Sequence, residues 1–345
     1  MTTSLAFPIN SAMTAFPFPV LVCDTGGTNV RFALKAAPDA PLGAAVHLKT
    51  WDYPGLGEAI AAATARLGTR ARSVIACGAG PVNGRTLKLT NAPWLMDGPL
   101  VAGQAQLAQG LLLNDFEAQA LALPAIPDDW SRLIGPQRFP GSGAQVILGP
   151  GTGLGIGALL EASGRHTPVA SEACHIDFGP VGEAEVAFWP HLQRAHGRIT
   201  TESVMSGTGL ARVHAARAAA KRMPDPGLDG AGVSAAAQAD AASEAAATIR
   251  AFWRLIARFA GDMAITFKAE GGVTLAGGIL PRLVGFLDDA EFRRAFEAKA
   301  PVESLARRIP TRLVTQADAV LVGMAAIAAR PELYAIDYGG RCWVG

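Results

Sequence analysis

The 345-residue sequence has few cysteines, few charged residues and no run of basic ones. Its four cysteines lie far apart without a C-x-x-C pair, which argues against both a structural zinc site and a disulfide framework. Charged residues make up 17% of the chain and the net charge is +1, so no electrostatic field is available to hold nucleic acid or an acidic membrane surface. We therefore expect a small-molecule partner, no nucleic acid and no membrane.

Signals for export are also missing from the sequence. The first thirty residues contain no Lys or Arg, so residues 1–19 lack the basic region of a secretory signal, and their prolines indicate an extended arm instead. The most apolar window, residues 145–160, is interrupted by glycines and a proline and is too broken for a membrane helix. These absences, together with the scattered cysteines, predict a cytoplasmic protein.

The apolar content and the length bound the fold. Half of the residues are apolar, which is enough for a sizeable core and excludes a disordered chain. A chain of 345 residues exceeds what one hydrophobic core usually supports, so we expect two domains.

The most informative motif begins at residue 20. Four successive apolar residues, typical of a strand buried on both faces, lead into an acid, two glycines and small polar residues. The glycines permit a tight turn whose backbone N–H groups can bind an anion. We expect phosphate contacts from Asp24, Gly26, Gly27, Thr28 and Asn29, with Asp24 also available to a metal ion or its water. On these residues alone, an ordinary glycine hairpin is the alternative.

A second strand and glycine turn of the same build follows at residues 145–159. Two such units suggest two related halves, each offering a phosphate loop to a ligand held between them. The turn residues are Gly151, Thr152 and Gly153. A Walker A motif is excluded because none of the six lysines follows a glycine, and the dinucleotide fingerprint fails because Leu154 stands where its third glycine is required.

Polar residues follow two further strands that we expect in the first half. Ligands of open α/β sheets gather at the carboxyl ends of strands, which makes Asn91 a candidate for ligand contact, although a turn residue before Pro93 is the alternative. Asn114 and Glu117 have the spacing of a capping box, which would explain both as helix-starting residues. That explanation does not cover Asp115, whose carboxylate stands where a general base would be placed.

The second half contains further polar candidates. Glu172 and His175 suit a metal site, a catalytic pair or hydrogen bonds to a polar ligand, although one cysteine and one histidine are too few for zinc and most isolated histidines are structural. Glu202 follows the start of a helix, which its charge would favour in any case. A third strand enters a glycine turn at Gly277 and Gly278, where a flat ring can approach the backbone.

Apolar spacing predicts helices over residues 55–67 and 234–267. Cys23 and Cys77 fall in strands that we expect to be buried, whereas Cys342 near the C-terminus is expected to be accessible.

In order and spacing, these motifs resemble those of the bacterial glucokinase family over about residues 20–327. Residues 24–29 are similar to the family's first phosphate motif, residues 149–155 to its second, and residues 275–281 to its adenosine motif. Residues 114–116 are similar to the segment that carries a sugar ligand and the catalytic base. The resemblance implies an α/β protein with the two-lobed actin-like ATPase (ribonuclease H-like) fold, in which two α/β domains flank a central cleft.

The resemblance also implies an activity, the phosphorylation of glucose at its 6-hydroxyl by ATP with Mg²⁺, in which Asp115 takes the hydroxyl proton. The phosphates of the nucleotide would contact the two glycine turns, and its adenosine would contact Gly277 and Gly278. The residues placed on the sugar are Asn91, Asn114, Asp115, Glu172, His175 and Glu202. A kinase for another hexose or with a polyphosphate donor, and a non-catalytic sugar sensor, are the alternatives.

We place an extended arm at residues 1–19, a small α/β domain at 20–125 with 315–345, and a large α/β domain at 126–314, and we expect a homodimer.

One departure from the family stands out, because the family usually has Glu-Gly-Gly-His where residues 172–175 are Glu-Ala-Cys-His. Two extra side chains then lie beside the sugar residues. The cysteine-rich zinc motif of the related repressor-and-kinase family is missing, as is a helix-turn-helix before Val20, so we do not expect a transcription factor.

Overall fold

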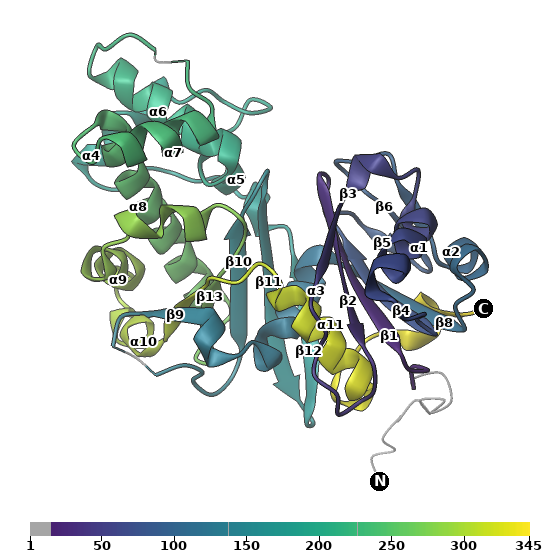
Figure 1. The fold of residues 1–345 in the computed structure, drawn as a ribbon. Coiled ribbons are helices and arrows are strands. Elements are labelled where there is room, and N and C mark those ends of the chain that lie inside the picture. The colour runs from purple at the N-terminus through teal and green to yellow at the C-terminus, as the bar shows by residue number, and fades with distance from the viewer. Residues whose placement is uncertain (1–14, 137, 226) are drawn as a thin grey trace. The chain divides into compact units, whose positions relative to one another are not determined.

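The computed structural model describes residues 15–136, 138–225 and 227–345, which divide into two compact units (Figure 1). The first comprises the described residues up to Ile126 with Glu161–Pro168 and Asp318–Gly345; the second comprises Pro127–Leu160 with Val169–Ala317. Of the expected N-terminal arm, residues 1–14 lie outside the described residues. The assignment of functional domain boundaries stays a prediction.

The first unit is built on a six-stranded sheet in the order β15-β8-β4-β1-β2-β3. Within it β1, β4 and β8 are parallel, while β2 and β15 run antiparallel to their neighbours. Every residue of β1 and β4 is buried, as expected of strands covered on both faces. The strands are β1 (Val20–Thr25), β2 (Asn29–Lys35), β3 (Val46–Lys49), β4 (Ser73–Gly78), β8 (Gln109–Asn114) and β15 (Cys342–Val344).

Helices cover both faces of this sheet (Figure 1). On one face lie α1 (Leu56–Leu67), which confirms the helix predicted there, and α2 (Gly98–Ala105). On the other lie α3 (Asp115–Ala122) and α11 (Ala319–Ala329), which contact each other closely. Glycine is needed at position 323 for this contact, because a Cβ there would lie 2.3 Å from that of Ala122. A small sheet of β5 (Val82–Asn83), β6 (Thr86–Lys88) and β7 (Leu95–Asp97), and the short α12 (Tyr338–Arg341), complete the unit.

The second unit is built on another six-stranded sheet, in the order β12-β11-β10-β13-β14-β9. The end of β11 and the first four residues of β12 fall within Glu161–Pro168, which is counted with the first unit. Its centre repeats the arrangement of the first, because β10 pairs antiparallel with the strand after its glycine turn and parallel with β13. The strands are β9 (Ser131–Ile134), β10 (Gln145–Pro150), β11 (Leu154–Ala162), β12 (Arg165–Ser171), β13 (Gly272–Leu275) and β14 (Thr311–Val314).

The helices of the second unit surround the long α8 (Glu244–Thr266), whose apolar stripe from Ile249 to Met263 is buried as the helical spacing predicts. The single helix expected over residues 234–267 is wrong in one respect: α7 ends before Asp240, whose backbone is extended, and Ser243 caps a new helix by accepting the Ala246 N–H at 3.2 Å. The remaining helices are α4 (Glu183–Val186), α5 (Thr201–Val204), α6 (Gly207–Ala220), α7 (Gly230–Ala239), α9 (Asp289–Glu297) and α10 (Glu303–Arg308).

All four cysteines are free and buried. This confirms the expectation for Cys23 and Cys77 but shows that the one for Cys342 is wrong. Cys342 belongs to β15, which pairs with β8; Cys342 and Trp343 are buried there, whereas Val344 is exposed.

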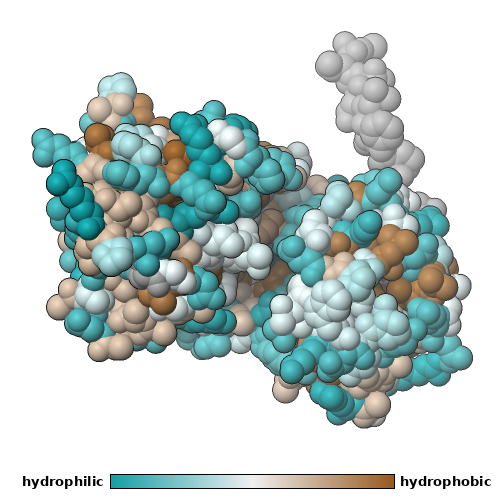
Figure 2. Space-filling model, turned by 90° about the horizontal axis from the view of Figure 1, so that it is seen from above, coloured by the Kyte–Doolittle hydropathy of each residue, from teal (hydrophilic) through white to brown (hydrophobic). Residues whose placement is uncertain are grey.

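Exposed large hydrophobic side chains are spread along the described chain, from Trp51 to Val344. On the face seen in Figure 2, hydrophobic residues form separate small groups among hydrophilic ones. No helix in the described part of the chain has the length and apolar run needed to cross a bilayer.

Candidate functional site

The first glycine turn joins β1 to β2 and is held by backbone hydrogen bonds. The Gly26 N–H donates to the Asn29 carbonyl at 2.9 Å. From outside the turn, the Thr50 hydroxyl donates to the Gly26 carbonyl at 2.7 Å and the Thr50 N–H to the Thr28 carbonyl at 3.0 Å. Thr28 and Asn29 are exposed. The predicted strand, turn and strand are therefore present, with the polar residues at the open side of the turn.

Asn91 lies against this turn although it is 64 positions further along the chain than Gly27. A Cβ at Gly27 would lie 2.8 Å from the Asn91 Cβ and 2.9 Å from the Asn91 carbonyl oxygen, so only glycine permits this approach. The Asn91 side chain is exposed. The structure thus brings Asn91 to the first glycine turn.

The carboxyl ends of β1, β4 and β8 lie level with one another. Asp24 is in register with Cys77, and Cys77 is in register with Leu113, which lies two positions before Asp115. The Cys77 thiol donates to Asp24 Oδ1 at 3.4 Å. Burial raises the pKa of Asp115 to about 6, and the charge of Asp24 adds to the rise while hydrogen bonds from Phe116 and Asn114 oppose it. Two predicted residues, Asp24 and Asp115, therefore meet at one edge of the sheet, with Cys77 on the strand between them.

Arg31 is a neighbour of Asp24 that the sequence analysis missed. The two residues face each other across the β1–β2 hairpin, and the Arg31 guanidinium forms an ion pair with Asp24 Oδ2. Since Cys77 donates to the other oxygen, both oxygens of the Asp24 carboxylate are engaged. The equal distance of Asp24 and Arg31 from the turn is the sequence signal that could have revealed this pair.

Asn114 has the helix-capping role that its spacing predicts. Its Oδ1 accepts the N–H groups of Phe116 at 3.0 Å and Glu117 at 3.2 Å, and the Glu117 carboxylate accepts the Asn114 N–H at 3.4 Å. The Asn114 amide also donates to the Gly80 carbonyl at 3.1 Å. Asp115 is the first residue of α3 and is not part of this box. Capping therefore accounts for Asn114 and Glu117 but not for the partly buried carboxylate between them.

The second glycine turn, between β10 and β11, packs against the end of β13. The Gly151 N–H donates to the Gly153 carbonyl at 2.8 Å, and the Gly151 carbonyl accepts the Gly207 N–H at 2.9 Å. Gly277 has a φ of +86°, and a Cβ there would lie 2.5 Å from the Pro150 carbonyl oxygen. The predicted phosphate turn and the predicted adenosine turn are thus adjacent, and glycine is required at their contact.

Three predicted positions in these two turns face open space. Thr152 is exposed at the tip of the second turn. A Cβ added to Gly151 or to Gly278 would meet no atom within 4 Å.

Glu202 is attached directly to the second turn. It lies in the first turn of α5, which is capped by Thr200, and its Oε2 accepts the Leu154 N–H at 3.0 Å. A Cβ at Gly153 would lie 2.5 Å from the same oxygen. The charge of Glu202 at a helix start has the predicted local explanation, but its side chain also connects that helix to the glycine turn.

Glu172 precedes a single turn of 3₁₀ helix at Ala173–His175, and His175 is the last residue of that turn. Their carboxylate and imidazole face each other, with 3.8 Å between Oε2 and Nε2, and both side chains are largely exposed. The buried Thr201 hydroxyl donates to the carbonyls of Ala173 at 2.9 Å and Cys174 at 2.7 Å, which fastens this turn to the start of α5. The structure therefore brings Glu172 and His175 to the same region of the second unit as Glu202.

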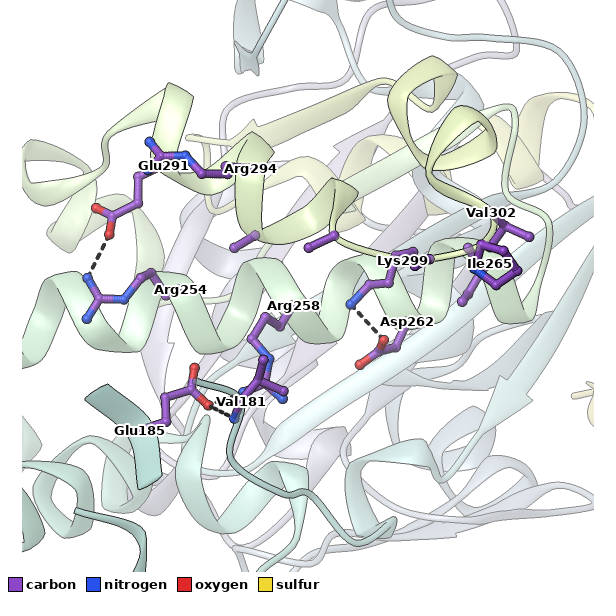
Figure 3. A pocket seen from close by; sticks show the side chains of 14 residues that line it. Val181, Glu185, Arg254, Arg258, Asp262, Ile265, Glu291, Arg294, Lys299 and Val302 are labelled. Carbon is purple, nitrogen blue, oxygen red and sulfur yellow. Dashed lines mark hydrogen bonds and ion pairs between the residues drawn. The ribbon is translucent and has the colours of Figure 1, made fainter. Parts of the chain in front are cut away.

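A pocket of about 720 Å³ lies elsewhere in the second unit, alongside α8 (Figure 3). None of the predicted site residues lines it. Three of its cations are already neutralised by carboxylates, as Figure 3 shows: Arg254 by Glu291, Arg258 by Glu185 and Lys299 by Asp262. This pocket therefore has little free positive charge for a phosphate ligand, and we do not place the site there.

Comparison with known proteins gives one consistent result. A family model described as Glucokinase matches residues 21–331. A glucokinase of Mesorhizobium japonicum is 36% identical over 97% of this chain and 98% of its own length, and one of Sinorhizobium medicae is 38% identical over 97% and 99%. The crystal structure of a glucokinase from an Antarctic psychrotroph matches with a TM-score of 0.81 at 28% identity, covering 90% of this chain and 99% of that one. This structural match confirms the expected actin-like ATPase fold.

Proposed function

This chain belongs to the glucokinase family, and we propose that it transfers the γ-phosphoryl group of ATP to the 6-hydroxyl of glucose. The observation that carries the proposal is the position and basicity of Asp115. Its carboxylate lies at the carboxyl edge of a parallel sheet, within reach of the charge of Asp24, and burial raises its pKa to about 6. Such a group is ionised at neutral pH and is a stronger base than an ordinary carboxylate.

In this proposal Asp115 accepts the proton of the sugar hydroxyl as the oxygen attacks the γ-phosphorus. Phosphoryl transfer requires mainly correct positioning and stabilisation of charge. Backbone N–H groups of the two glycine turns would bind the phosphates, since Thr28 and Asn29 of the first turn and Thr152 of the second are exposed and Gly151 faces open space. The bare backbone at Gly278 would accept the flat adenine ring.

Asp24 is the residue whose carboxylate would contact Mg²⁺. Mg²⁺ in proteins keeps several waters and is bound through one or two carboxylates together with substrate phosphates. Because both oxygens of Asp24 already have partners, its carboxylate suits a contact through water better than a direct one. Bound beside the phosphates, the ion would neutralise charge that develops during transfer.

The remaining polar residues would determine which sugar is accepted. Each would pair with a hydroxyl group of glucose, and a sugar lacking one hydroxyl would leave a polar group unsatisfied at a cost of about 1–3 kcal/mol. In the second unit, the hydrogen bond between Glu202 and the Leu154 N–H would connect sugar recognition to the second glycine turn. The proposed sugar residues are Asn91, Asn114, Glu172, His175 and Glu202.

Coupled measurement of ADP release over a panel of hexoses tests the function. We expect the highest kcat/KM with glucose and ATP, and lower values with mannose, fructose and glucosamine because one polar contact is lost or misplaced. Measuring the formation of glucose 6-phosphate with polyphosphate in place of ATP shows which of the two phosphate donors is used. Binding of glucose without any turnover would contradict the proposal and identify a sugar sensor.

A Gly151→Val variant is expected to weaken ATP binding at least about tenfold, because its side chain would project into the open space of the second glycine turn, where a phosphate should lie. Gly153→Val is less informative, since its side chain would also displace Glu202. Titration calorimetry of Mg·ATP without sugar measures the effect. Gly103→Val is the matched control, because it adds the same side chain to open space on the exposed part of α2. Equal ATP affinity in a folded Gly151→Val protein would remove this turn from the nucleotide site.

The homodimer and the cytoplasmic location stay predictions. Four free, buried cysteines are consistent with a reducing compartment. Analytical ultracentrifugation of the purified chain would check the dimer.

A further inference from the structure

Glu172, Cys174 and His175 place three metal-binding atoms together on one side of a 3₁₀ turn. Cys174 Sγ lies 3.7 Å from Glu172 Oε2, which lies 3.8 Å from His175 Nε2, and the three ligand atoms are all within 4.8 Å of one another. Ligands at 2.0–2.3 Å around a tetrahedral Zn²⁺ are separated by about 3.3–3.8 Å. The exposed Glu172 and His175 side chains have room to rotate toward that separation.

The backbone that carries these residues is already fixed. The Thr201 hydroxyl holds the carbonyls of Ala173 and Cys174, and the His175 N–H donates to the Glu172 carbonyl at 3.0 Å. Little backbone conformational entropy would therefore be lost when a cation binds.

The exposure of the three side chains suits a site with open coordination positions. Cys174 is 5% exposed and forms the floor, while Glu172 and His175 are 88% and 57% exposed at the rim. Three protein ligands with room for a fourth from solvent is the arrangement of accessible zinc sites. A thiol in this position is a departure of this chain, since the family usually has glycine there.

We propose that Glu172, Cys174 and His175 form a binding site for a thiophilic divalent cation such as Zn²⁺, and that the bound cation excludes glucose. The first half of the proposal depends only on the geometry. The second half rests on the proposed function, in which Glu172 and His175 bind sugar hydroxyls. A cation on their carboxylate and imidazole would occupy the same lone pairs that the hydroxyls need.

The Cys174 thiol must lose its proton when a cation binds. Without a cation, the Cys174 sulfur is a buried thiol that faces Glu172 Oε2 at 3.7 Å. A divalent cation reverses the local charge balance; the S–H bond breaks, the proton leaves to solvent, and a metal–thiolate bond forms.

Spectroscopy with Co²⁺ as the probe tests the site directly on the full chain. We expect one Co²⁺ per chain with the near-ultraviolet absorption of a cobalt–thiolate bond, which Zn²⁺ abolishes by displacement. Cys174→Gly restores the family residue and should lose this band. The matched control Cys342→Ala removes another buried cysteine and should keep it. A wild-type protein without the band, or equal Zn²⁺ affinity in the wild type and Cys174→Gly, overturns the site.

Calorimetric titration of glucose without nucleotide tests the second half, because it avoids binding of Zn²⁺ to ATP. We expect Zn²⁺ to lower glucose affinity at least tenfold in the wild type, reversibly with a chelator, and to leave Cys174→Gly almost unaffected. A cobalt–thiolate band with unchanged glucose affinity in the presence of Zn²⁺ overturns the exclusion of glucose while the metal site stands. Failure of the protein to phosphorylate any hexose would contradict the proposed function and leave the spectroscopic result intact.

Discussion

An Asp115→Asn variant is expected to lose at least about 100-fold in kcat with only a modest loss of glucose affinity. Asparagine keeps the shape of the side chain and the oxygen that accepts the Phe116 N–H, but it cannot accept a proton. A purely structural role predicts the opposite, since asparagine starts a helix as well as aspartate does. Steady-state kinetics with glucose and ATP decide between the two roles.

Asp97→Asn is the matched control for this experiment. Asp97 also starts a helix of the first unit, where its Oδ1 accepts the Leu100 N–H at 3.1 Å. The same loss of one negative charge at a helix start should leave kcat within about twofold of the wild type, because no reacting group is involved. A similar fall in kcat in both variants would assign the effect to helix charge and not to proton transfer.

The pH dependence gives an independent check on Asp115. Because its pKa is about 6, kcat/KM of the wild type should fall as pH decreases through about 6, where the base becomes protonated. The residual activity of Asp115→Asn should lack this limb. A wild-type profile that is flat between pH 5 and pH 8 would contradict the role of Asp115 as the base.

The same substitution should stabilise the fold at neutral pH. A carboxylate whose folded pKa lies above its usual value favours the unfolded state increasingly as pH rises from about 4 to about 6. Replacing it by asparagine removes that penalty, which amounts to at most about 3 kcal/mol above pH 6 and less at pH 5. Urea unfolding of both proteins at pH 5 and pH 8 measures the difference. Function and stability are thus expected to change in opposite directions.

A Trp343→Ala variant is expected to lose about 3–5 kcal/mol of unfolding free energy, although the residue is the third from the C-terminus. Its side chain is fully buried between two backbone segments of the first unit. A Cβ at Gly98 or at Gly110 would lie within 2.3 Å of the indole ring, so the ring fits directly over both glycines. Truncation would leave a cavity beside β8, the strand that ends at Asn114.

Two comparison variants separate packing from other effects of this substitution. Trp51 is 65% exposed, so Trp51→Ala should change the unfolding free energy by less than about 0.5 kcal/mol. The Trp343 indole N–H has no acceptor among the described residues, so Trp343→Phe, which removes that group and keeps an aromatic ring, should cost clearly less than alanine. Chemical denaturation of the three variants provides the measurement. A Trp343→Ala protein within 1 kcal/mol of the wild type would contradict the packing.

The sequence by itself determined the features that depend on residues close together in the chain. An apolar run followed by a glycine turn specifies a strand and its turn, because burial and the absence of a Cβ act locally; both glycine turns were predicted correctly for this reason. The capping box of Asn114 and Glu117 was likewise predictable, since its two hydrogen bonds join residues three positions apart.

Only the tertiary structure decided which of these segments meet. The placement of Asp115 near Asp24 depends on the register of three parallel strands, and each strand looks equally apolar from its sequence whatever its neighbour. The burial of Cys342 depends on a three-residue strand that is too short to have a pattern of its own and forms because β8 offers a free edge. The contact of Glu202 with the second glycine turn spans 48 positions of the chain, and such non-local contacts are set by the packing of the whole unit, which no local pattern records.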